Sequence, residues 1–367
     1  MKESLLKVAL ITNMVTPYRI PVWKALSSFD IDLNILTLVE SEPNRNWNKD
    51  YHGSKVKSLR GFRKYMPFFE AGVYIAPNLF LEKEFTRSSI VILTGYENPT
   101  YLAALIYCKM TGKPIVLWWG SHEKSSKIKN RFFLKLKKKI LDQFDGYVTY
   151  GRKSTQYLIN IGIDKKEIST GVNTVDVEKF RRLDSMFVRS GNVRKFLFVG
   201  QLIDRKGIQD LIDVFAEYGR PDQTLSIVGD GELINYVKIA CKNTHNIRYL
   251  GSVNTVEEMA AIYWDHDALF IPSKAEVWGL VANEAIAAGL YVVVSNNSGS
   301  ADDLKALFPN RVIVFDIERR DGLISALMEV SSRNILQFNA DIDLISPSVY
   351  AEAIAKSIFE TAKRRQR

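Results

Sequence analysis

The segment IPSKAEVWGLVANEAIAAGLYVVVS, residues 271–295, contains two glutamates, Glu276 and Glu284, with seven uncharged residues between them. An apolar run at residues 268–271 leads into it and a β-branched run at residues 291–295 ends it, and both runs have the length of a buried strand. Between them, the Ala-rich stretch of residues 280–288 is typical of an apolar helix, and Gly279 marks its start. The segment therefore predicts a strand, a helix and a second strand, with Glu276 in the loop before the helix and Glu284 in its first turns.

The same alternation of short β-branched runs and helical patterns continues along the whole chain. It predicts strands in a first set at residues 7–13, 31–39, 88–96, 113–120 and 146–151, and in a second set at residues 195–202, 225–231, 246–252, 268–273, 291–297 and 311–315. Such alternation favours parallel sheets flanked by helices. With 367 residues, of which 46% are hydrophobic, the chain is long enough to form two such domains.

The polar, Gly-containing stretch between the two sets lacks periodicity, and we interpret it as a linker. The last segment begins with Ser346 and Pro347, which are favoured at a helix start, and its apolar residues fall on one face: Tyr350, Ile354 and Ile358. We expect a first domain at residues 1–183, the linker at 184–192, a second domain at 193–345, and a C-terminal helix at 346–367 that crosses back to the first domain.

Several features bear on the compartment of the protein. The two cysteines, Cys108 and Cys241, lie far apart and form no CxxC pair, which favours a reducing compartment. The first residues show no signal-peptide pattern, and no apolar run reaches the roughly 18 residues that a spanning helix needs. We therefore expect a cytoplasmic protein that is soluble or, at most, peripheral at the inner face of the cell membrane.

The usual motifs of cofactor and metal chemistry are absent from the sequence. The turn after the first predicted strand has no glycine, so the GxGxxG signature of dinucleotide binding is missing, and no phosphate-binding loop occurs elsewhere. No GxSxG elbow is present, and the four histidines are scattered outside any metal-ligand motif. We expect neither a resident cofactor nor a metal.

The net charge of +9 is concentrated in residues 121–144. The cations there are Lys124, Lys127, Lys129, Arg131, Lys135, Lys137, Lys138 and Lys139, and apolar residues recur every four positions at Ile128, Phe132, Leu136, Ile140 and Phe144. This pattern predicts an amphipathic helix with a basic outer face. The face is either solvated or attracted through Lys127–Lys139 to an anionic membrane surface or a phosphate-bearing acceptor. No motif of nucleic-acid recognition accompanies it, so we expect no nucleic-acid partner.

The predicted carboxyl ends of the second set of strands carry charged residues, and ligands of parallel sheets bind at that edge. Arg205 and Lys206 stand side by side in one such turn, where they either bind an anion or remain solvated. An ionised carboxylate would repel that anion, so Glu276 and Glu284 should face hydroxyl groups, unless they only complement the helix dipole. A nucleotide sugar has hydroxyls at both ends and a diphosphate between them.

Taken together, these residues make the chain resemble the retaining glycosyltransferases of family 4. That family has the GT-B fold, which is α/β with two facing Rossmann-like domains, parallel sheets and a cleft between them. The similar segments occur in family order: ITNMVTPYRIPVWKAL, TGVNTVDVEKF, FVGQLIDRKGIQDLI, IVGDGE, YLGSV and the segment of residues 271–295.

The resemblance implies roles for residues on the donor side. Glu276 would lie near the hydroxyls of the donor sugar and Glu284 at those of the ribose. Arg205 and Lys206 would hold the diphosphate and stabilise the charge that grows on it as the glycosidic bond breaks. Further donor contacts would come from the backbone of Gly279, Leu280 and Val281, from Val253 near the base, and from His122 near the donor sugar.

The resemblance also implies an acceptor side in the first domain. Its candidate residues are Pro17, Tyr18, Arg19 and Trp119. Trp118 and Trp119 fit either an acceptor wall or the core, and we expect at least one of them in the core. Two positions depart from the family pattern. Residues 16–19 occupy the turn where many relatives have a glycine pair. Gln201 stands where many relatives have a phosphate-binding arginine, whose role would pass to Arg205.

The function expected from the resemblance is that of a metal-independent, retaining hexosyltransferase-type enzyme. It would move a sugar from a nucleotide-diphosphate sugar, with UDP favoured and GDP possible, to a glycan or lipid-linked acceptor in cell-surface polysaccharide synthesis. The alternative, suggested by Gln201 and the basic helix, is a non-catalytic protein of the same fold that binds nucleotide sugars or a membrane surface.

Overall fold

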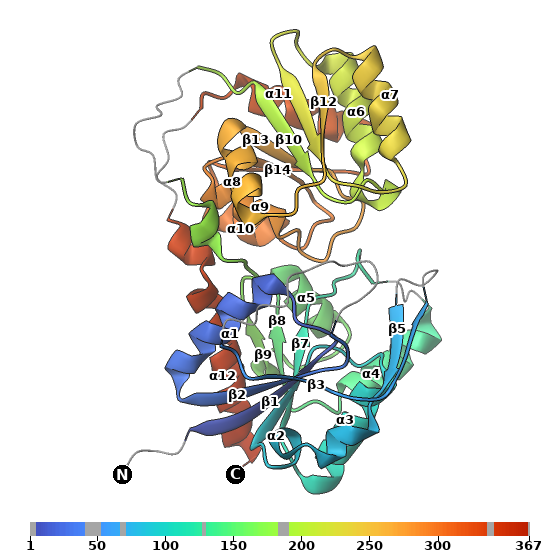
Figure 1. The fold of residues 1–367 in the computed structure, drawn as a ribbon, viewed down its shortest axis with the longest axis vertical. Coiled ribbons are helices and arrows are strands. Elements are labelled where there is room, and N and C mark those ends of the chain that lie inside the picture. Colours follow the sequence, from blue (N-terminus) through green and yellow to red (C-terminus); the bar gives the residue numbers. More distant parts are fainter. Residues whose placement is uncertain are drawn as a thin grey trace. The chain divides into compact units, whose positions relative to one another are not determined.

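The computed structural model describes residues 5–40, 53–66, 71–126, 130–182, 191–335 and 341–365. The chain divides into two compact units (Figure 1). Unit 1 comprises Met1–Gly120, Ser126–Val175 and Pro347–Arg367, and unit 2 comprises Ser121–Ser125 and Asp176–Ser346. Of the predicted linker, residues 184–190 lie outside the described residues.

Unit 1 is built on a seven-stranded sheet in the order β3-β2-β1-β6-β7-β8-β9, and all of its neighbouring strands run parallel. The strands are β1 (Leu6–Thr12), β2 (Ile31–Thr37), β3 (Val56–Ser58), β6 (Ile90–Leu93), β7 (Ile115–Trp119), β8 (Gly146–Thr149) and β9 (Ile168–Thr170). A separate antiparallel pair consists of β4 (Phe62–Met66) and β5 (Ala71–Ile75).

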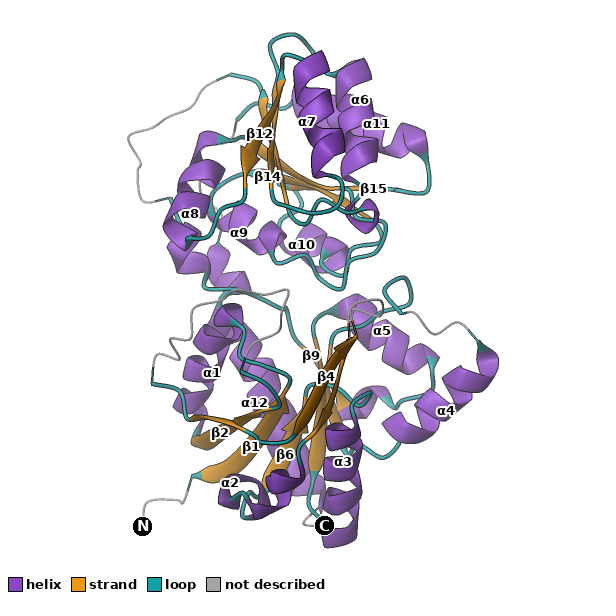
Figure 2. Cartoon of the chain, turned by 45° about the vertical axis from the view of Figure 1, so that its right-hand side comes forward, coloured by secondary structure: helices purple, strands orange, loops and turns teal. Residues whose placement is uncertain are grey.

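Helices cover both faces of this sheet (Figure 2). They are α1 (Ile20–Leu26), α2 (Lys83–Thr86), α3 (Pro99–Thr111), α4 (Arg131–Leu141), α5 (Arg152–Asn160) and α12 (Pro347–Arg365). Successive side chains of a strand point to opposite faces, so Val8 and Leu10 pack with α1 and α12, while Ala9 and Ile11 pack with α2 and α3. The sheet thus separates two apolar cores.

Helix α12 closes one face of unit 1. Its residues Tyr350, Ile354 and Ile358 are fully buried, which confirms the apolar face predicted for them. The helix approaches β8 closely, because a Cβ atom on Gly146 would lie only 2.1 Å from Oγ1 of Thr361.

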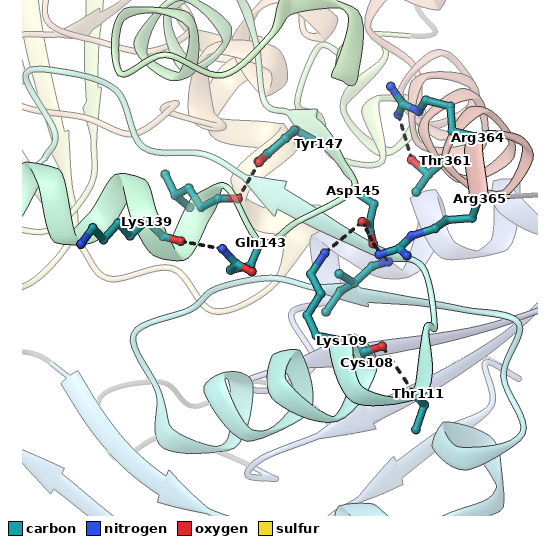
Figure 3. A network of polar contacts seen from close by, with 12 residues as sticks. Cys108, Lys109, Thr111, Lys139, Gln143, Asp145, Tyr147, Thr361, Arg364 and Arg365 are labelled. Atoms are coloured by element: carbon teal, nitrogen blue, oxygen red, sulfur yellow. Dashed lines mark hydrogen bonds and ion pairs between the residues drawn. The ribbon is translucent and has the colours of Figure 1, made fainter. Parts of the chain in front are cut away.

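The end of α12 is held by charge. Figure 3 shows Asp145, the residue directly before β8, between two cations. The carboxylate accepts from Lys109 of α3 at 3.0 Å and from Arg365 of α12 at 2.9 Å. Its other oxygen accepts from the backbone amide of Ile115 at 3.0 Å, so one side chain connects the end of α12 to a helix and a strand of unit 1.

Unit 2 contains a six-stranded parallel sheet in the order β12-β11-β10-β13-β14-β15. The strands are β10 (Lys195–Val199), β11 (Thr224–Val228), β12 (Ile247–Gly251), β13 (Ala268–Ile271), β14 (Tyr291–Ser295) and β15 (Val312–Phe315), and the helices are α6 (Ile208–Tyr218), α7 (Ile234–Asn243), α8 (Val256–Asp265), α9 (Val281–Ala287), α10 (Ala301–Leu307) and α11 (Arg320–Ser332). The chain order reverses between β10 and β13, which is the topological switch point where sheets of this kind bind ligands.

The predicted α/β fold with parallel sheets is confirmed, and a strand is present in every predicted strand segment. The sequence reasoning missed β3, β9 and the pair formed by β4 and β5, because these are short or lie outside the parallel sheets. Within the described ranges, no helix is long and apolar enough to cross a membrane. Burial raises the pKa of the Cys108 thiol to about 12, so this cysteine is unreactive.

The predicted basic helix is present as α4, and its predicted inward residues Ile140 and Phe144 pack on the core, but the prediction is wrong for Phe132, Leu136 and Lys137. In α4 the predicted inward residues Phe132 and Leu136 are 70% and 49% exposed, and Phe133 is also exposed, whereas Lys137 is buried. Lys137 lies inside because its ammonium group donates to the hydroxyl of Tyr157 at 2.8 Å and sits over aromatic rings. The predicted Lys127, Ile128 and Lys129 lie outside the described residues.

Candidate functional site

The predicted cations and Glu276 meet at the switch point of unit 2. Arg205 and Lys206 follow β10 in a short 3-10 helix, Asp204–Lys206, and Glu276 follows β13. Lys206 forms an ion pair with the carboxylate of Glu276. Arg205 lies 4.0 Å from that carboxylate and donates to the carbonyl of Ala275 at 2.9 Å. Residues 70 positions apart in the sequence are therefore neighbours, because neighbouring parallel strands end at one edge.

The two cations differ in how far they are committed to the protein. The side chain of Lys206 is 20% exposed and that of Glu276 is 13% exposed, whereas that of Arg205 is 43% exposed. An ammonium group has three donors, so Lys206 can hold Glu276 and still donate to an anion. Arg205 donates through Nη1 and is the more exposed of the two cations. Arg205 and Lys206 make this edge of the sheet positively charged, and Lys206 holds the Glu276 carboxylate in place.

The backbone of Glu276 is held from two further directions. Its carbonyl oxygen accepts from the amide of Gly299 at 2.9 Å and from Nε2 of His122 at 2.8 Å. A carbonyl oxygen can only accept, so Nε2 of His122 carries the proton. His122 is buried and belongs to unit 2, as part of Ser121–Ser125. The structure thus brings His122 to the backbone of Glu276.

Gly279 shapes the turn between Glu276 and α9. Its φ of +86° is in the left-handed region that side chains rarely adopt. A Cβ atom there would also lie 3.3 Å from Cγ of Glu276 and 3.4 Å from Oγ of Ser298. Leu280 and Val281 follow directly and begin the helix, half-buried. Glycine at this position therefore lets the loop fold back beside the carboxylate.

Glu284 lies in the first turn of α9 in a strongly desolvated setting. Burial raises the pKa of its carboxyl group to about 7, and a hydrogen bond from Tyr263 opposes that rise. The Tyr263 hydroxyl donates to Oε2 at 2.7 Å. The sequence reasoning missed Tyr263, because only the packing of α8 against α9 brings it near Glu284. Val253 lies half-buried after β12, at the outer edge of the sheet order.

In unit 1, the candidate acceptor residues differ in their exposure. Pro17 is exposed and Tyr18 is half-buried, but Arg19 and Trp119 are buried. Arg19 donates to Oδ1 of Asn173 at 2.7 Å, and its guanidinium carbon lies 4.6 Å from the ring centre of Trp118.

Trp119 is enclosed by other side chains. It stacks between Tyr96 and Tyr157, with ring centres 5.8 and 6.3 Å away, and the ammonium group of Lys137 lies 4.7 Å from its ring centre. The sequence reasoning had placed Lys137 on a solvated face, whereas its ammonium group lies against these rings. Trp118 and Trp119 point to opposite faces of the sheet because they are consecutive in β7.

A polar cluster that the sequence reasoning missed lies at the carboxyl edge of the unit 1 sheet. The Tyr101 hydroxyl donates to Oδ1 of Asn13 at 2.8 Å, and the Thr94 hydroxyl donates to that of Thr12 at 3.1 Å. Thr12 ends β1 and Asn13 follows it, Thr94 follows β6, and Tyr101 lies in α3; the strand order of unit 1 reverses between β1 and β6. Among the described residues, no group of three histidine, cysteine or acidic side chains could hold a metal ion.

Comparison with known proteins agrees with this arrangement. Residues 184–336 match the family described as "Glycosyl transferases group 1". An uncharacterized glycosyltransferase of Methanocaldococcus jannaschii is 34% identical over 148 residues, which cover 39% of this chain and 37% of that protein. The UDP-Gal:alpha-D-GlcNAc-diphosphoundecaprenol alpha-1,3-galactosyltransferase of Escherichia coli is 28% identical over 193 residues, which cover 47% of this chain and 48% of that protein. The chain therefore matches less than half of the length of either relative.

A solved structure extends the similarity to the whole fold. The lipopolysaccharide outer core galactosyltransferase WaaB superposes with a TM-score of 0.67 and 17% identity, covering 96% of this chain and 99% of that one. Arg205, Lys206, Glu276 and Glu284 all fall in the matched family segment. Residues 184–336 therefore constitute a glycosyl transferases group 1 domain, and the chain is homologous to glycosyltransferases over that part.

Proposed function

We propose that the protein is a retaining glycosyltransferase that moves a hexosyl group from a nucleotide-diphosphate sugar to a glycan or lipid-linked acceptor in cell-surface polysaccharide synthesis. One observation carries this proposal: Arg205, Lys206 and Glu276 meet at the switch point of a glycosyl transferases group 1 domain. This arrangement combines two cations for a diphosphate with a fixed acceptor oxygen for sugar hydroxyls.

The leaving group would be stabilised by positive charge. As the bond between the sugar and the diphosphate breaks, negative charge grows on the phosphate oxygens, and Arg205 and Lys206 are placed to stabilise it. The backbone amides of Gly279, Leu280 and Val281 would add neutral donors. Two protein cations supply the charge that a metal would otherwise provide, and this supports a metal-independent transfer. A front-face displacement, in which the leaving phosphate takes the acceptor proton, would retain the configuration.

The donor's hydroxyl groups would be bound by the two glutamates. Glu276, held by Lys206 through its carboxylate and by His122 through its carbonyl, would accept from the hydroxyls of the sugar. Glu284 would accept from those of the ribose, and Val253 would contact the base. His122 would act by positioning the loop of Glu276.

The nucleotide and the acceptor are proposed from the relatives. The Escherichia coli relative uses UDP-Gal and a diphosphoundecaprenol acceptor according to its name, and the structural neighbour WaaB acts in the lipopolysaccharide outer core. UDP is therefore the favoured carrier and GDP the second choice. On the acceptor side, Pro17 and Tyr18 are accessible and would contact the acceptor. Arg19 and Trp119 are buried, so they would act by packing beneath the acceptor-binding surface.

A binding screen tests the choice of nucleotide. UDP, GDP and ADP are titrated calorimetrically into the wild-type protein and into the variant Arg205→Ala, with no metal added. We expect one nucleotide to bind more tightly than the others and to lose about tenfold in affinity in the variant, because a charge-assisted hydrogen bond to phosphate is lost. Equal and unaltered binding of all three would contradict the proposed diphosphate site.

The second candidate function is nucleotide-sugar binding without catalysis. Gln201, a neutral residue in the turn after β10, favours it, because the site then has one cation fewer than it could have. The two candidates differ in a single observable, which is the release of the sugar from its nucleotide.

We also propose that the protein is cytoplasmic and peripheral at the inner face of the membrane, through α4. The corrected orientation of α4 supports this, because Phe132, Phe133 and Leu136 are exposed beside the exposed cations Lys135 and Lys139. Exposed apolar side chains flanked by lysines are typical of a helix that lies in an anionic membrane interface.

Vesicle binding tests this surface. Replacing Phe132 and Phe133 by serine should reduce co-sedimentation with vesicles of anionic phospholipid by about tenfold or more, because the apolar area of two rings is no longer buried in lipid. Replacing Lys135 and Lys139 by glutamine should remove the salt-sensitive part of the binding. The control is Ile239→Ser, an equally exposed apolar residue in α7 of unit 2. Unchanged binding of both α4 variants would exclude this membrane surface.

A further inference from the structure

Tyr263 is a fully buried residue of α8 whose hydroxyl points at the carboxylate of Glu284. Its ring packs edge-to-face against Phe180 with ring centres 5.8 Å apart. The next residue, Trp264, donates its indole N–H to the carbonyl of Phe180 at 2.9 Å, which ties α8 to the same segment. The phenol is thus fixed by packing on its ring, and within the described ranges its hydroxyl has a single polar contact, with Oε2 of Glu284.

The two oxygens of Glu284 have different surroundings. Oε2 accepts from Tyr263, whereas Oε1 meets no donor among the residues that the structure describes. The residue is half-buried, so that second oxygen is accessible to a ligand. A carboxylate with one oxygen fixed and the other free has a defined direction in which it can accept.

Among the residues that the structure describes, no charged side chain compensates Glu284. Segments 177–180 and 342–345 and strands β13 and β14 pack against α9, and α8 contributes Tyr263. Their titratable residues are Glu178, Lys179, Asp343, Tyr291, Glu257, Glu258 and Asp265. All of these are exposed except Tyr291, whose hydroxyl donates to the carbonyl of Asn334. Tyr263 is therefore the group that acts on the Glu284 carboxylate, and its hydrogen bond favours the ionised form.

We propose that Tyr263 is a positioning residue that directs the free oxygen of Glu284 toward the ribose diol of the nucleotide. This inference rests on the proposed function, since it takes a ribonucleoside diphosphate as the ligand. By directing the Glu284 oxygen, Tyr263 would make the site prefer a ribonucleotide over the corresponding 2′-deoxyribonucleotide. A site that hydrogen-bonds a hydroxyl rejects the analogue without it, because its acceptor is then left unpaired.

The pH dependence follows from the direction of the pKa shift. The pKa of Glu284 is about 7, so the carboxylate is ionised above this pH and protonated below it. Preference for the diol should therefore grow as pH rises through 7. Without the Tyr263 hydroxyl, the hydrogen bond that lowers this pKa is lost, and the rise should move to higher pH.

The experiment measures the ratio of UDP to 2′-deoxy-UDP affinity by calorimetry between pH 5.5 and 9. Titration of the nucleotide phosphate is common to both ligands and cancels in the ratio. For Tyr263→Phe we expect the affinity ratio at pH 7 to fall by about tenfold, the size of one hydrogen bond to a charged group. We also expect the midpoint of the rise of this ratio with pH to shift to higher pH. For Glu284→Gln, which keeps the shape and cannot ionise, we expect a low ratio at every pH.

The matched control is Tyr291→Phe, which removes another hydroxyl of a buried tyrosine in unit 2. It should keep the wild-type ratio and midpoint, which separates positioning from a general loss of packing. The inference is overturned if Tyr263→Phe binds UDP with the wild-type ratio and midpoint, or if Glu284→Gln keeps the pH dependence. Absence of UDP and GDP binding in the wild-type protein would instead overturn the proposed function.

Discussion

Replacing Lys206 by alanine should lower the rate of sugar transfer by about 10²- to 10³-fold, which corresponds to roughly 2.7–4 kcal/mol of transition-state stabilisation by analogy with the loss of one oxyanion donor. The physical reason is twofold. The variant loses a cation aimed at the leaving diphosphate, and it leaves the half-buried Glu276 carboxylate without its ion-pair partner. The effect should appear in kcat more than in KM, because the charge on the phosphate is largest in the transition state.

The matched control for this variant is Lys274→Ala. Lys274 lies near the same turn, but its side chain is 44% exposed and pairs with Asp204 at 2.6 Å and Asp210 at 3.5 Å. An exposed ion pair contributes little, so activity should change by no more than a few fold. If Lys206→Ala and Lys274→Ala lost activity equally, the loss would come from removing any positive charge at this turn. The specific role proposed for Lys206 would then be contradicted.

Replacing Tyr350 by alanine should destabilise the protein by about 3–5 kcal/mol, the cost of truncating a large buried aromatic side chain. Tyr350 is fully buried in α12, accepts from the indole of Trp118 at 2.5 Å, and packs beside Arg19 and Tyr150. The Arg19 guanidinium would also lose its cation–π contact with the Tyr350 ring. Urea-induced unfolding, followed by tryptophan fluorescence, measures the change.

Tyr350→Phe separates the ring from the hydroxyl. It keeps the packing and loses the hydroxyl's hydrogen bonds with Trp118 and Arg19, so it should cost about 1–3 kcal/mol. A Tyr350→Ala variant within 1 kcal/mol of the wild type, or a phenylalanine variant as unstable as the alanine variant, would show that α12 is not held by the packing of this ring.

Much of the fold follows from the sequence because buried parallel strands are short β-branched runs, and these runs are visible without any tertiary information. The meeting of Arg205, Lys206 and Glu276 follows from the same logic, since residues that come after neighbouring strands share an edge of the sheet. What periodicity could not reveal is a short edge strand such as β3, whose three residues carry no pattern.

The misplaced side chains have a common physical cause. Periodicity treats every lysine as solvated, but Lys137 is buried because three rings, from Tyr96, Trp119 and Tyr157, surround its ammonium group, and this displaces Phe132 and Leu136 to the surface. In the same way, a tyrosine in a helix gives no signal of its hydrogen-bond partner. Contacts between elements, such as that between α8 and α9, are set by packing that a single sequence does not encode locally.

The measurement that tests the central claim most directly is the release of sugar from UDP- and GDP-sugars in the presence of a metal chelator, with and without glycan and lipid-linked acceptors. It compares the wild-type protein with Glu276→Ala. The account predicts slow release by the wild type without metal, faster release when the right acceptor is added, and loss of both in the variant. Tight nucleotide binding with no release of sugar under any of these conditions would contradict it and leave a binding protein in its place.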